Sequence, residues 1–206
     1  MNVFARVDAA PYRALDLHAH ALLRDVPLHD VWQVSLPGGG PDRTLADLRA
    51  LMSLDEVGRA HPLVAGLFHL RGFLGRVFGW DEEPGPTAGA RGRPESETLA
   101  RVPPEVRERS DPAPGTPDPP FFVLYALPRE SVGEVRNATV HAFSVMALEP
   151  TPDGYRATWA IHVAPTGRLT PFYMALIAPF RRWIVYPAIL RHVHHRWVEV
   201  YGGATR

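Results

Sequence analysis

Two consecutive segments in the C-terminal half, residues 138–148 and 155–164, alternate between apolar and polar side chains with a period of two. This is the period of a β-strand, in which successive side chains point to opposite faces of a sheet. Between the segments lies Pro150-Thr151-Pro152-Asp153-Gly154, which is rich in turn-forming residues. The pattern predicts an antiparallel hairpin, whose apolar face needs a covering layer.

The register of this hairpin decides which side chains share a face, because a shift of one residue moves every side chain to the other face. Pairing Glu149 with Tyr155 predicts one face that is apolar except at His141 and Thr139. The predicted opposite pairs on that face are His141 with Val163, Phe143 with Ile161, and Val145 with Trp159.

The covering layer is predicted at residues 169–201, where large side chains recur at steps of three and four, the period of an amphipathic helix. The recurring residues are Tyr173, Leu176, Phe180, Trp183, Pro187, Leu190, His194, Trp197 and Tyr201. Pro179 and Pro187 predict a kink or a division into two helices. The stretch 172–190 has the length of a membrane span, but Arg181 and Arg182 at its centre would each cost about 2.5–3.5 kcal/mol there. We therefore expect a helix packed on a domain and no transmembrane segment.

Shorter patterns complete the predicted elements. Helices are predicted at 12–23, from the N-cap Thr44 to about Ser53, and at 61–78. Strands are predicted at 30–36 and 121–127, and a charged strand or a turn is predicted near 131–136. Early helices, a meander of antiparallel strands and a long terminal helix indicate an α+β protein. We expect a helix-grip arrangement, in which the antiparallel sheet wraps around the long C-terminal helix. Residues 1–81 and 121–206 would form this single domain.

Residues 82–120 differ from the rest of the chain in composition. They contain 10 of the 22 prolines, and their only large apolar residues are Leu99, Val102 and Val106. Such a segment buries too little apolar surface to offset its ordering entropy. It is predicted to be a disordered insertion or a lid, with a short helix near 104–109.

The charge balance and the absence of cysteine exclude several classes of function. Lys plus Arg and Asp plus Glu both number 22, whereas a nucleic-acid binder needs a basic surface. Without cysteine there are no disulfides and no thiolate metal sites. No cofactor motif is present. His192, His194 and His195 lack the carboxylate spacing of a zinc enzyme, so they are predicted to be surface residues. The N-terminus lacks a signal peptide, and a cytoplasmic location is expected.

Four stretches of the chain resemble a known bacterial family. Residues 136–143 and 169–187, together with His29-Asp30-Val31-Trp32 and Leu67-Phe68-His69-Leu70-Arg71, are similar to the family catalogued as domain of unknown function 2867. The helix that contains Pro179-Phe180-Arg181-Arg182 is the most specific part of the resemblance. The resemblance implies a START-like (SRPBCC-type) helix-grip fold without an established general reaction.

In a helix-grip fold, a cavity between the sheet and the C-terminal helix is the expected site, and such cavities bind small, mostly apolar molecules. The predicted ligand-binding residues are His141, Arg181, Arg71, Tyr173, Trp159 and Trp183. His141 is the candidate general acid or base, and Arg181 or Arg182 would bind an anionic oxygen. In the alternative interpretation both residues are structural: His141 is a core histidine, and Arg181 is paired with Asp30 or Glu134.

Two functional hypotheses follow. The first is a protein that binds a small hydrophobic or amphipathic molecule, as a carrier, a sensor or a cyclase- or hydratase-type enzyme. The second is a structural or interaction module whose core is filled by its own side chains and whose residues 82–120 bind a partner. Residues from Trp197 to Tyr201 would be free for a homodimer contact. Cavity volume distinguishes the two hypotheses.

Overall fold

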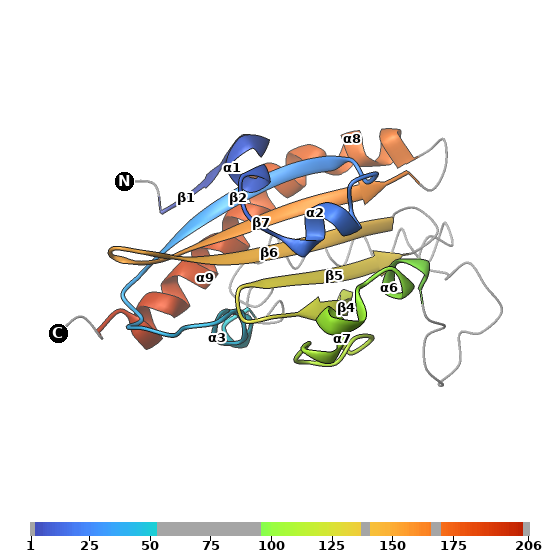
Figure 1. The fold of residues 1–206 in the computed structure, drawn as a ribbon. Helices are drawn as coiled ribbons and strands as arrows, with labels where there is room; N and C mark the ends of the chain where they lie inside the picture. The colour runs from blue at the N-terminus through green and yellow to red at the C-terminus, as the bar shows by residue number, and fades with distance from the viewer. Residues whose placement is uncertain (1–2, 53–95, 137–140, 166–169, 204–206) are drawn as a thin grey trace.

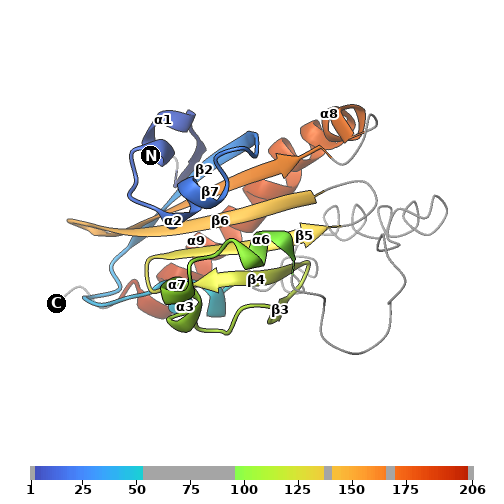
Figure 2. The same ribbon diagram turned by 45° about the vertical axis from the view of Figure 1, so that its right-hand side comes forward.

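The computed structural model of the chain describes residues 3–52, 96–136, 141–165 and 170–203. This part has the predicted α+β architecture, a single antiparallel sheet with helices on both faces (Figures 1 and 2). The strands are β1 (Phe4–Arg6), β2 (Leu28–Pro37), β3 (Pro117–Asp118), β4 (Phe121–Ala126), β5 (Glu130–Arg136), β6 (His141–Thr151) and β7 (Gly154–Ala164). The helices are α1 (Ala9–Arg13), α2 (His18–Leu22), α3 (Leu45–Ala50), α6 (Glu97–Ala100), α7 (Pro104–Glu108), α8 (Thr170–Phe180) and α9 (Tyr186–Tyr201), with a π-helical turn, η1 (Arg181–Val185), between the last two.

Within the described residues the sheet has seven strands in the order β1-β2-β7-β6-β5-β4-β3. The strands predicted at 30–36 and 121–127 are confirmed as β2 and β4, and of the strand or turn expected near 131–136 the strand forms, as β5. The helix expected after Thr44 is confirmed as α3, where the Asp47 carboxylate accepts the Thr44 N–H at 2.8 Å. The helix predicted at 61–78 lies outside the described residues.

The predicted hairpin forms, but its predicted register is wrong by one residue. Glu149 lies opposite Arg156, and β6 and β7 continue until Thr151 faces Gly154. The connection is therefore a two-residue turn rather than the five-residue loop that was expected. Gly154 adopts a φ of 145°, and a Cβ there would collide with the backbone of Leu36 and Gly38, so a glycine is needed at this close approach.

The one-residue difference places His141 and Trp159 on opposite faces of the sheet. Helices α9 and α3 cover one face of the sheet, which we call the α9 face, and α1, α2, α6 and α7 cover the other, which we call the α1/α2 face (Figures 1 and 2). Trp159 lies on the α9 face, whereas His141 lies beside Phe143 on the α1/α2 face. Each face carries its own apolar cluster. Alternation could not select the register, because both faces of the hairpin are buried.

The single helix predicted at 12–23 is instead two short helices, α1 and α2. The interruption between α1 and α2 is caused by a residue that is distant in the sequence. The buried carboxylate of Glu130 accepts the N–H groups of His18 at 3.0 Å and Ala19 at 2.8 Å. It thereby satisfies two donors at the start of α2 that a continuous helix would bond internally.

The prediction of disorder at 82–120 is wrong for residues 96–120, whereas residues 82–95 lie outside the described part. Helices α6 and α7 form there, and α7 confirms the short helix expected near 104–109. Val102 and Val106 are almost fully buried in the cluster on the α1/α2 face. The few apolar residues suffice because the sheet supplies the surface that the segment itself lacks.

The C-terminal helical region forms over residues 170–201, with the π-helical turn η1 between its two α-helices. Tyr186, Leu190 and Trp197 are buried on the sheet, which contradicts the expected exposure of Trp197 at a dimer contact. Phe180 and Trp183 are exposed, because the π-turn changes the helical phase and directs Arg181 and Arg182 inward. No helix in the described ranges is long and apolar enough to cross a lipid bilayer.

Candidate functional site

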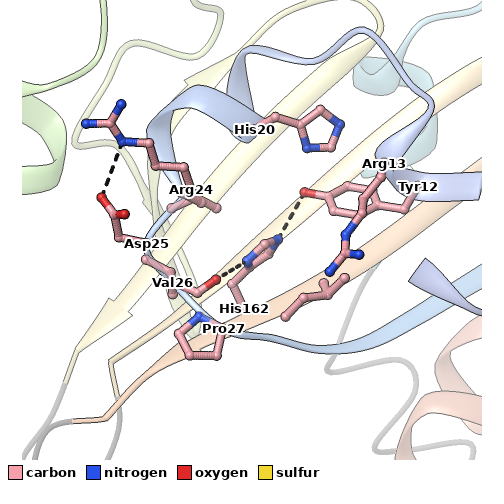
Figure 3. Close-up of a pocket in the computed structure, with 10 residues that line it drawn as sticks. Tyr12, Arg13, His20, Arg24, Asp25, Val26, Pro27 and His162 are labelled. Atoms are coloured by element: carbon pink, nitrogen blue, oxygen red, sulfur yellow. Dashed lines mark hydrogen bonds and ion pairs between the residues drawn. The ribbon is translucent and has the colours of Figure 1, made fainter. Parts of the chain in front are cut away.

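A half-open cleft of about 570 Å³ lies on the α1/α2 face (Figure 3). Helices α1 and α2, the connection to β2, and β7 form its walls. Its polar lining residues are Tyr12, Arg13, His20, Arg24, Asp25 and His162. Its apolar lining residues are Leu23, Val26, Pro27 and Leu28. The volume falls within the range of small-molecule sites, and the mixed lining suits an amphipathic molecule.

Tyr12 and His162, which are 150 residues apart in the chain, form a hydrogen bond in this cleft (Figure 3). The Nδ1 atom of His162 lies 2.9 Å from the carbonyl oxygen of Val26, which only accepts, so Nδ1 carries the proton. In the neutral ring, Nε2 then accepts from the Tyr12 hydroxyl at 3.0 Å. The contacts therefore determine both the tautomer of His162 and the direction in which Tyr12 donates.

Burial keeps this pair uncharged. Desolvation lowers the pKa of His162 below its usual value, so the imidazole is neutral at pH 7. Desolvation, followed by the nearby negative charge of Glu130, raises the pKa of the Tyr12 phenol. His20 packs edge-on against Tyr12 at 4.8 Å and lies 3.0 Å from the carbonyl oxygen of Leu15 through Nε2. Its Nδ1 is therefore an acceptor when the ring is neutral.

The cleft combines a neutral hydrogen-bonding wall with a charged rim. The Tyr12 oxygen has lone pairs left after donating to His162, so it can accept from a ligand hydroxyl or amine. Arg13 and Arg24 supply two cations at the rim, and Asp25 supplies one anion in an exposed pair with Arg24. The balance of charge at the rim favours ligands with an acidic group.

Acid is expected to destabilise the chain through His162. The unfolded chain takes up a proton at this histidine near its ordinary pKa of 6.5, whereas the folded chain, in which the pKa of His162 is lower, does so only at more acidic pH. The free energy of unfolding therefore falls as the pH decreases from 6.5 towards the folded pKa, by at most about 1.4 kcal/mol per pH unit from this one proton.

The measurement is the free energy of unfolding in urea at pH 7.5 and at pH 5.0, for the wild type and for His162→Gln. His29, whose pKa is also lowered by burial and then by Arg181, is present in both proteins and so belongs to the common background. The wild type should lose more stability in acid than the variant. Equal losses would show that His162 does not titrate as the cleft requires.

A second polar group lies on the α9 face, where the buried carboxylate of Asp30 meets three arginines. Its oxygens contact Arg6 Nε at 3.0 Å, Arg182 Nε at 2.8 Å and Arg181 Nη2 at 3.4 Å. Asp30 thus confirms one of the two partners expected for Arg181. Tyr186 lies beside this group and accepts from Arg181 Nη1 at 3.3 Å, and burial raises the pKa of its phenol to about 12.

The predicted ligand-binding residues that the structure describes lie apart from one another. His141 lies on the α1/α2 face, 2.7 Å from the Glu134 carboxylate, which matches the structural alternative of a core histidine. Trp159 is buried on the α9 face and donates to Ser144, while Trp183 is 77% exposed. Arg71 and the side chain of Tyr173 lie outside the described part.

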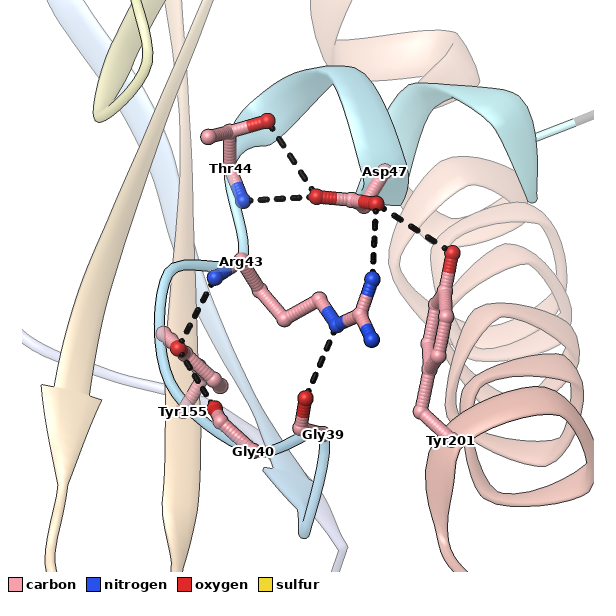
Figure 4. Close-up of polar contacts among 7 residues, drawn as sticks. All are labelled: Gly39, Gly40, Arg43, Thr44, Asp47, Tyr155 and Tyr201. Carbon is pink, nitrogen blue, oxygen red and sulfur yellow. Dashed lines mark hydrogen bonds and ion pairs between the residues drawn. The ribbon is translucent and has the colours of Figure 1, made fainter. Parts of the chain in front are cut away.

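A third polar group connects the end of α9 to α3 (Figure 4). Asp47 accepts from Arg43 at 3.3 Å and from Tyr201 at 3.4 Å, and Tyr155 donates to the carbonyl of Gly40 at 2.9 Å. Burial alone would raise the pKa of Asp47, but hydrogen bonds from Thr44 and Arg43 outweigh it and lower the pKa. These groups form hydrogen bonds to one another, which indicates a structural role in fixing the end of α9 against α3.

Sequence reasoning missed Tyr12, His20 and His162 as a site. His162 lies within the second strand of the predicted hairpin, and Tyr12 and His20 lie within the helix predicted at 12–23, but no sequence motif marks any of the three as part of a site. Local spacing cannot reveal a contact between residues that are 150 positions apart. Among the described residues, no three His, Asp or Glu side chains gather in a way that could hold a metal ion.

Comparison with known proteins gives one match. The sequence pattern of a family described as "Protein of unknown function (DUF2867)" matches residues 22–188. No curated protein matches the chain. The matched range includes Asp30, His162, Arg181 and Arg182, whereas Arg6, Tyr12 and His20 precede it.

Proposed function

The chain belongs to the DUF2867 family of proteins of unknown function, and we propose that it binds a small amphipathic molecule in the Tyr12–His162 cleft. The observation that carries this proposal is the cleft itself, about 570 Å³ in volume, with Tyr12 and His162 in its wall. Small-molecule sites have this size, and they combine apolar walls with a few convergent polar groups.

The chemistry of the lining indicates how the ligand is oriented. An apolar part would rest on Leu23, Val26 and Leu28, while a hydroxyl or amine would donate to the Tyr12 oxygen. An acidic group would face Arg13 and Arg24 at the rim. We propose this site in preference to the cavity expected under the C-terminal helix, because Trp32 and Trp159 both pack against Tyr186 there.

Proton transfer to the bound molecule is a second candidate function, and the Tyr12–His162 hydrogen bond favours it. A ligand proton would pass to the Tyr12 oxygen as the Tyr12 proton passes to Nε2 of His162. The pair would then act as a general base, in keeping with a cyclase- or hydratase-type reaction. We also propose that the fold is of the helix-grip, START-like type, which is supported by the packing of α9 against the sheet.

A fluorescent anionic amphiphile, 1-anilinonaphthalene-8-sulfonate, tests the binding site. We expect saturable binding of the dye to the native chain. The Leu28→Trp variant should bind it at least about tenfold more weakly, a loss of about 1.4 kcal/mol, because the larger side chain fills the cleft opposite His162. Titration of dye fluorescence measures both affinities, and circular dichroism checks that the variant is folded.

Arg156→Gln is the matched control, since Arg156 is an exposed cation on β7 and lies far along the strand from His162. This variant should bind the dye as the wild type does. Equal dye affinity in the wild type and in Leu28→Trp would contradict the proposed site and favour the interaction-module alternative. Native mass spectrometry of the gently purified chain then identifies the natural ligand, as a reproducible mass excess that is absent after denaturation and absent in Leu28→Trp.

A further inference from the structure

The arginines gathered on Asp30 come from two distant parts of the chain. Arg6 lies on β1, next to β2, which carries Asp30, while Arg181 and Arg182 lie on the π-turn η1. The π-turn lets two successive residues of one helix reach the same carboxylate, at 3.4 Å and 2.8 Å. Such turns are frequent at functional sites.

The charges in this group do not balance. Three guanidinium groups face Asp30, which is the single carboxylate that they contact within the described part of the chain. The Asp30 side chain is fully buried, whereas those of Arg181, Arg182 and Arg6 are 15%, 34% and 49% exposed. The buried carboxylate therefore attracts all three guanidinium groups. Among the described residues, two of the three positive charges of this group remain uncompensated, and they lie toward solvent.

Hydrogen-bond donors are also in excess here. Trp32 is 95% buried, on the same α9 face, and its indole Nε1 has no hydrogen-bond partner among the described residues. The same is true of Arg181 Nε. Both groups can only donate, and buried donors are normally satisfied. They flank one residue: Trp32 packs edge-on to the Tyr186 ring at 5.8 Å, and the Arg181 guanidinium lies 5.7 Å from its centroid.

Among the described residues, nothing binds the Nη groups of two of these arginines. Arg6 and Arg182 each contact Asp30 through Nε, and their Nη groups make no hydrogen bond to the described residues. Paired N–H groups on a guanidinium match the oxygens of a carboxylate or a phosphate. Within the described part of the chain, this group has fewer acceptors than donors and less negative than positive charge, and an oxyanion supplies both an acceptor and a negative charge.

We propose that Arg6, Arg181 and Arg182, held by Asp30, form a binding site for an oxyanion, the carboxylate or phosphate group of a small molecule. This site lies on the α9 face and is separate from the Tyr12–His162 cleft on the other side of the sheet. It does not depend on the function proposed for the cleft.

Nuclear magnetic resonance of the tryptophan indole N–H groups tests this site. The chain has five tryptophans, and the Trp32→Phe variant assigns the signal of Trp32. The probes are inorganic phosphate and, in parallel, acetate, at constant ionic strength maintained with sodium chloride. We expect the Trp32 signal to shift and saturate with at least one of the two anions. The affinity should fall at least about tenfold in Arg182→Gln, and Arg6→Gln gives the same test if Arg182→Gln does not fold.

Arg24→Gln is the control, because Arg24 is an exposed arginine at the rim of the cleft. It should leave the anion affinity unchanged. Absence of a saturable Trp32 shift with both anions overturns the proposal, and so does an unchanged affinity in the arginine variants. A loss of affinity in Arg24→Gln alone also overturns it, since the anion would then bind at the cleft.

Discussion

Replacing Asp30 with asparagine is expected to lower the free energy of unfolding by about 3–5 kcal/mol. The carboxylate is completely buried and contacts three guanidinium groups, so its loss leaves partly buried cations facing one another without compensation. Removing one partner of a buried ion pair lowers stability by far more than the intact pair contributes to it, because the other charge stays buried without compensation. Chemical denaturation followed by circular dichroism measures the change.

Asp25→Asn is the matched control, because Asp25 also pairs with an arginine but is 76% exposed. Its effect should stay within about 0.5 kcal/mol. In Asp30→Asn, additional replacement of Arg181 by methionine should recover part of the lost stability, because one uncompensated cation disappears. A loss below about 1 kcal/mol for Asp30→Asn would mean that solvent already screens the arginines.

Replacing Glu130 with alanine is expected to cost a similar amount, about 3–5 kcal/mol, for a different reason. Its carboxylate accepts from the backbone of His18 and Ala19 and, at 2.6 Å, from the Tyr125 hydroxyl. Ala19 and Tyr125 are buried, so their donors would lose their partner without gaining water, at about 1–3 kcal/mol each. The same denaturation experiment measures the loss.

Hydrogen exchange locates the part of the structure that loses stability in Glu130→Ala. In Glu130→Ala the amide of Ala19 should lose protection first, because it sits at the start of α2. Glu108→Ala, at the exposed end of α7, is the control and should change neither stability nor exchange measurably. Because α2 forms one wall of the cleft, dye binding should weaken in Glu130→Ala as well. Full protection of Ala19 in the variant would contradict this account.

The candidate site was the least predictable part of the chain. The α+β class, the hairpin and the terminal helix were predicted, yet His141 was assigned to the wrong face by a one-residue error in register. The error has a physical source. Ala142, Met146 and Leu148 cover one face of β6, and Phe143 and Val145 cover the other, so alternation between apolar and polar residues carries little information there.

The sequence by itself determined the features that depend on neighbours within a few residues. These are the start of α3 at Thr44, the short helix α7, the strands β2, β4 and β5, and the helical character of residues 170–201. Periodicity and capping are local, so they can be deduced from short stretches of sequence. The arginines of the terminal helix also argued against a membrane span, and the pairing of Arg181 with Asp30 was one of the alternatives that the sequence left open.

Only the tertiary structure decided the features that depend on contacts between distant residues. Glu130 divides the first predicted helix, the sheet orders the proline-rich segment 96–120, and β7 brings His162 to Tyr12. The π-turn selects Arg181 and Arg182 together for Asp30, where the sequence left a choice between them. Each of these outcomes requires burial against a surface that is remote in sequence, and desolvation there determines which polar groups must pair.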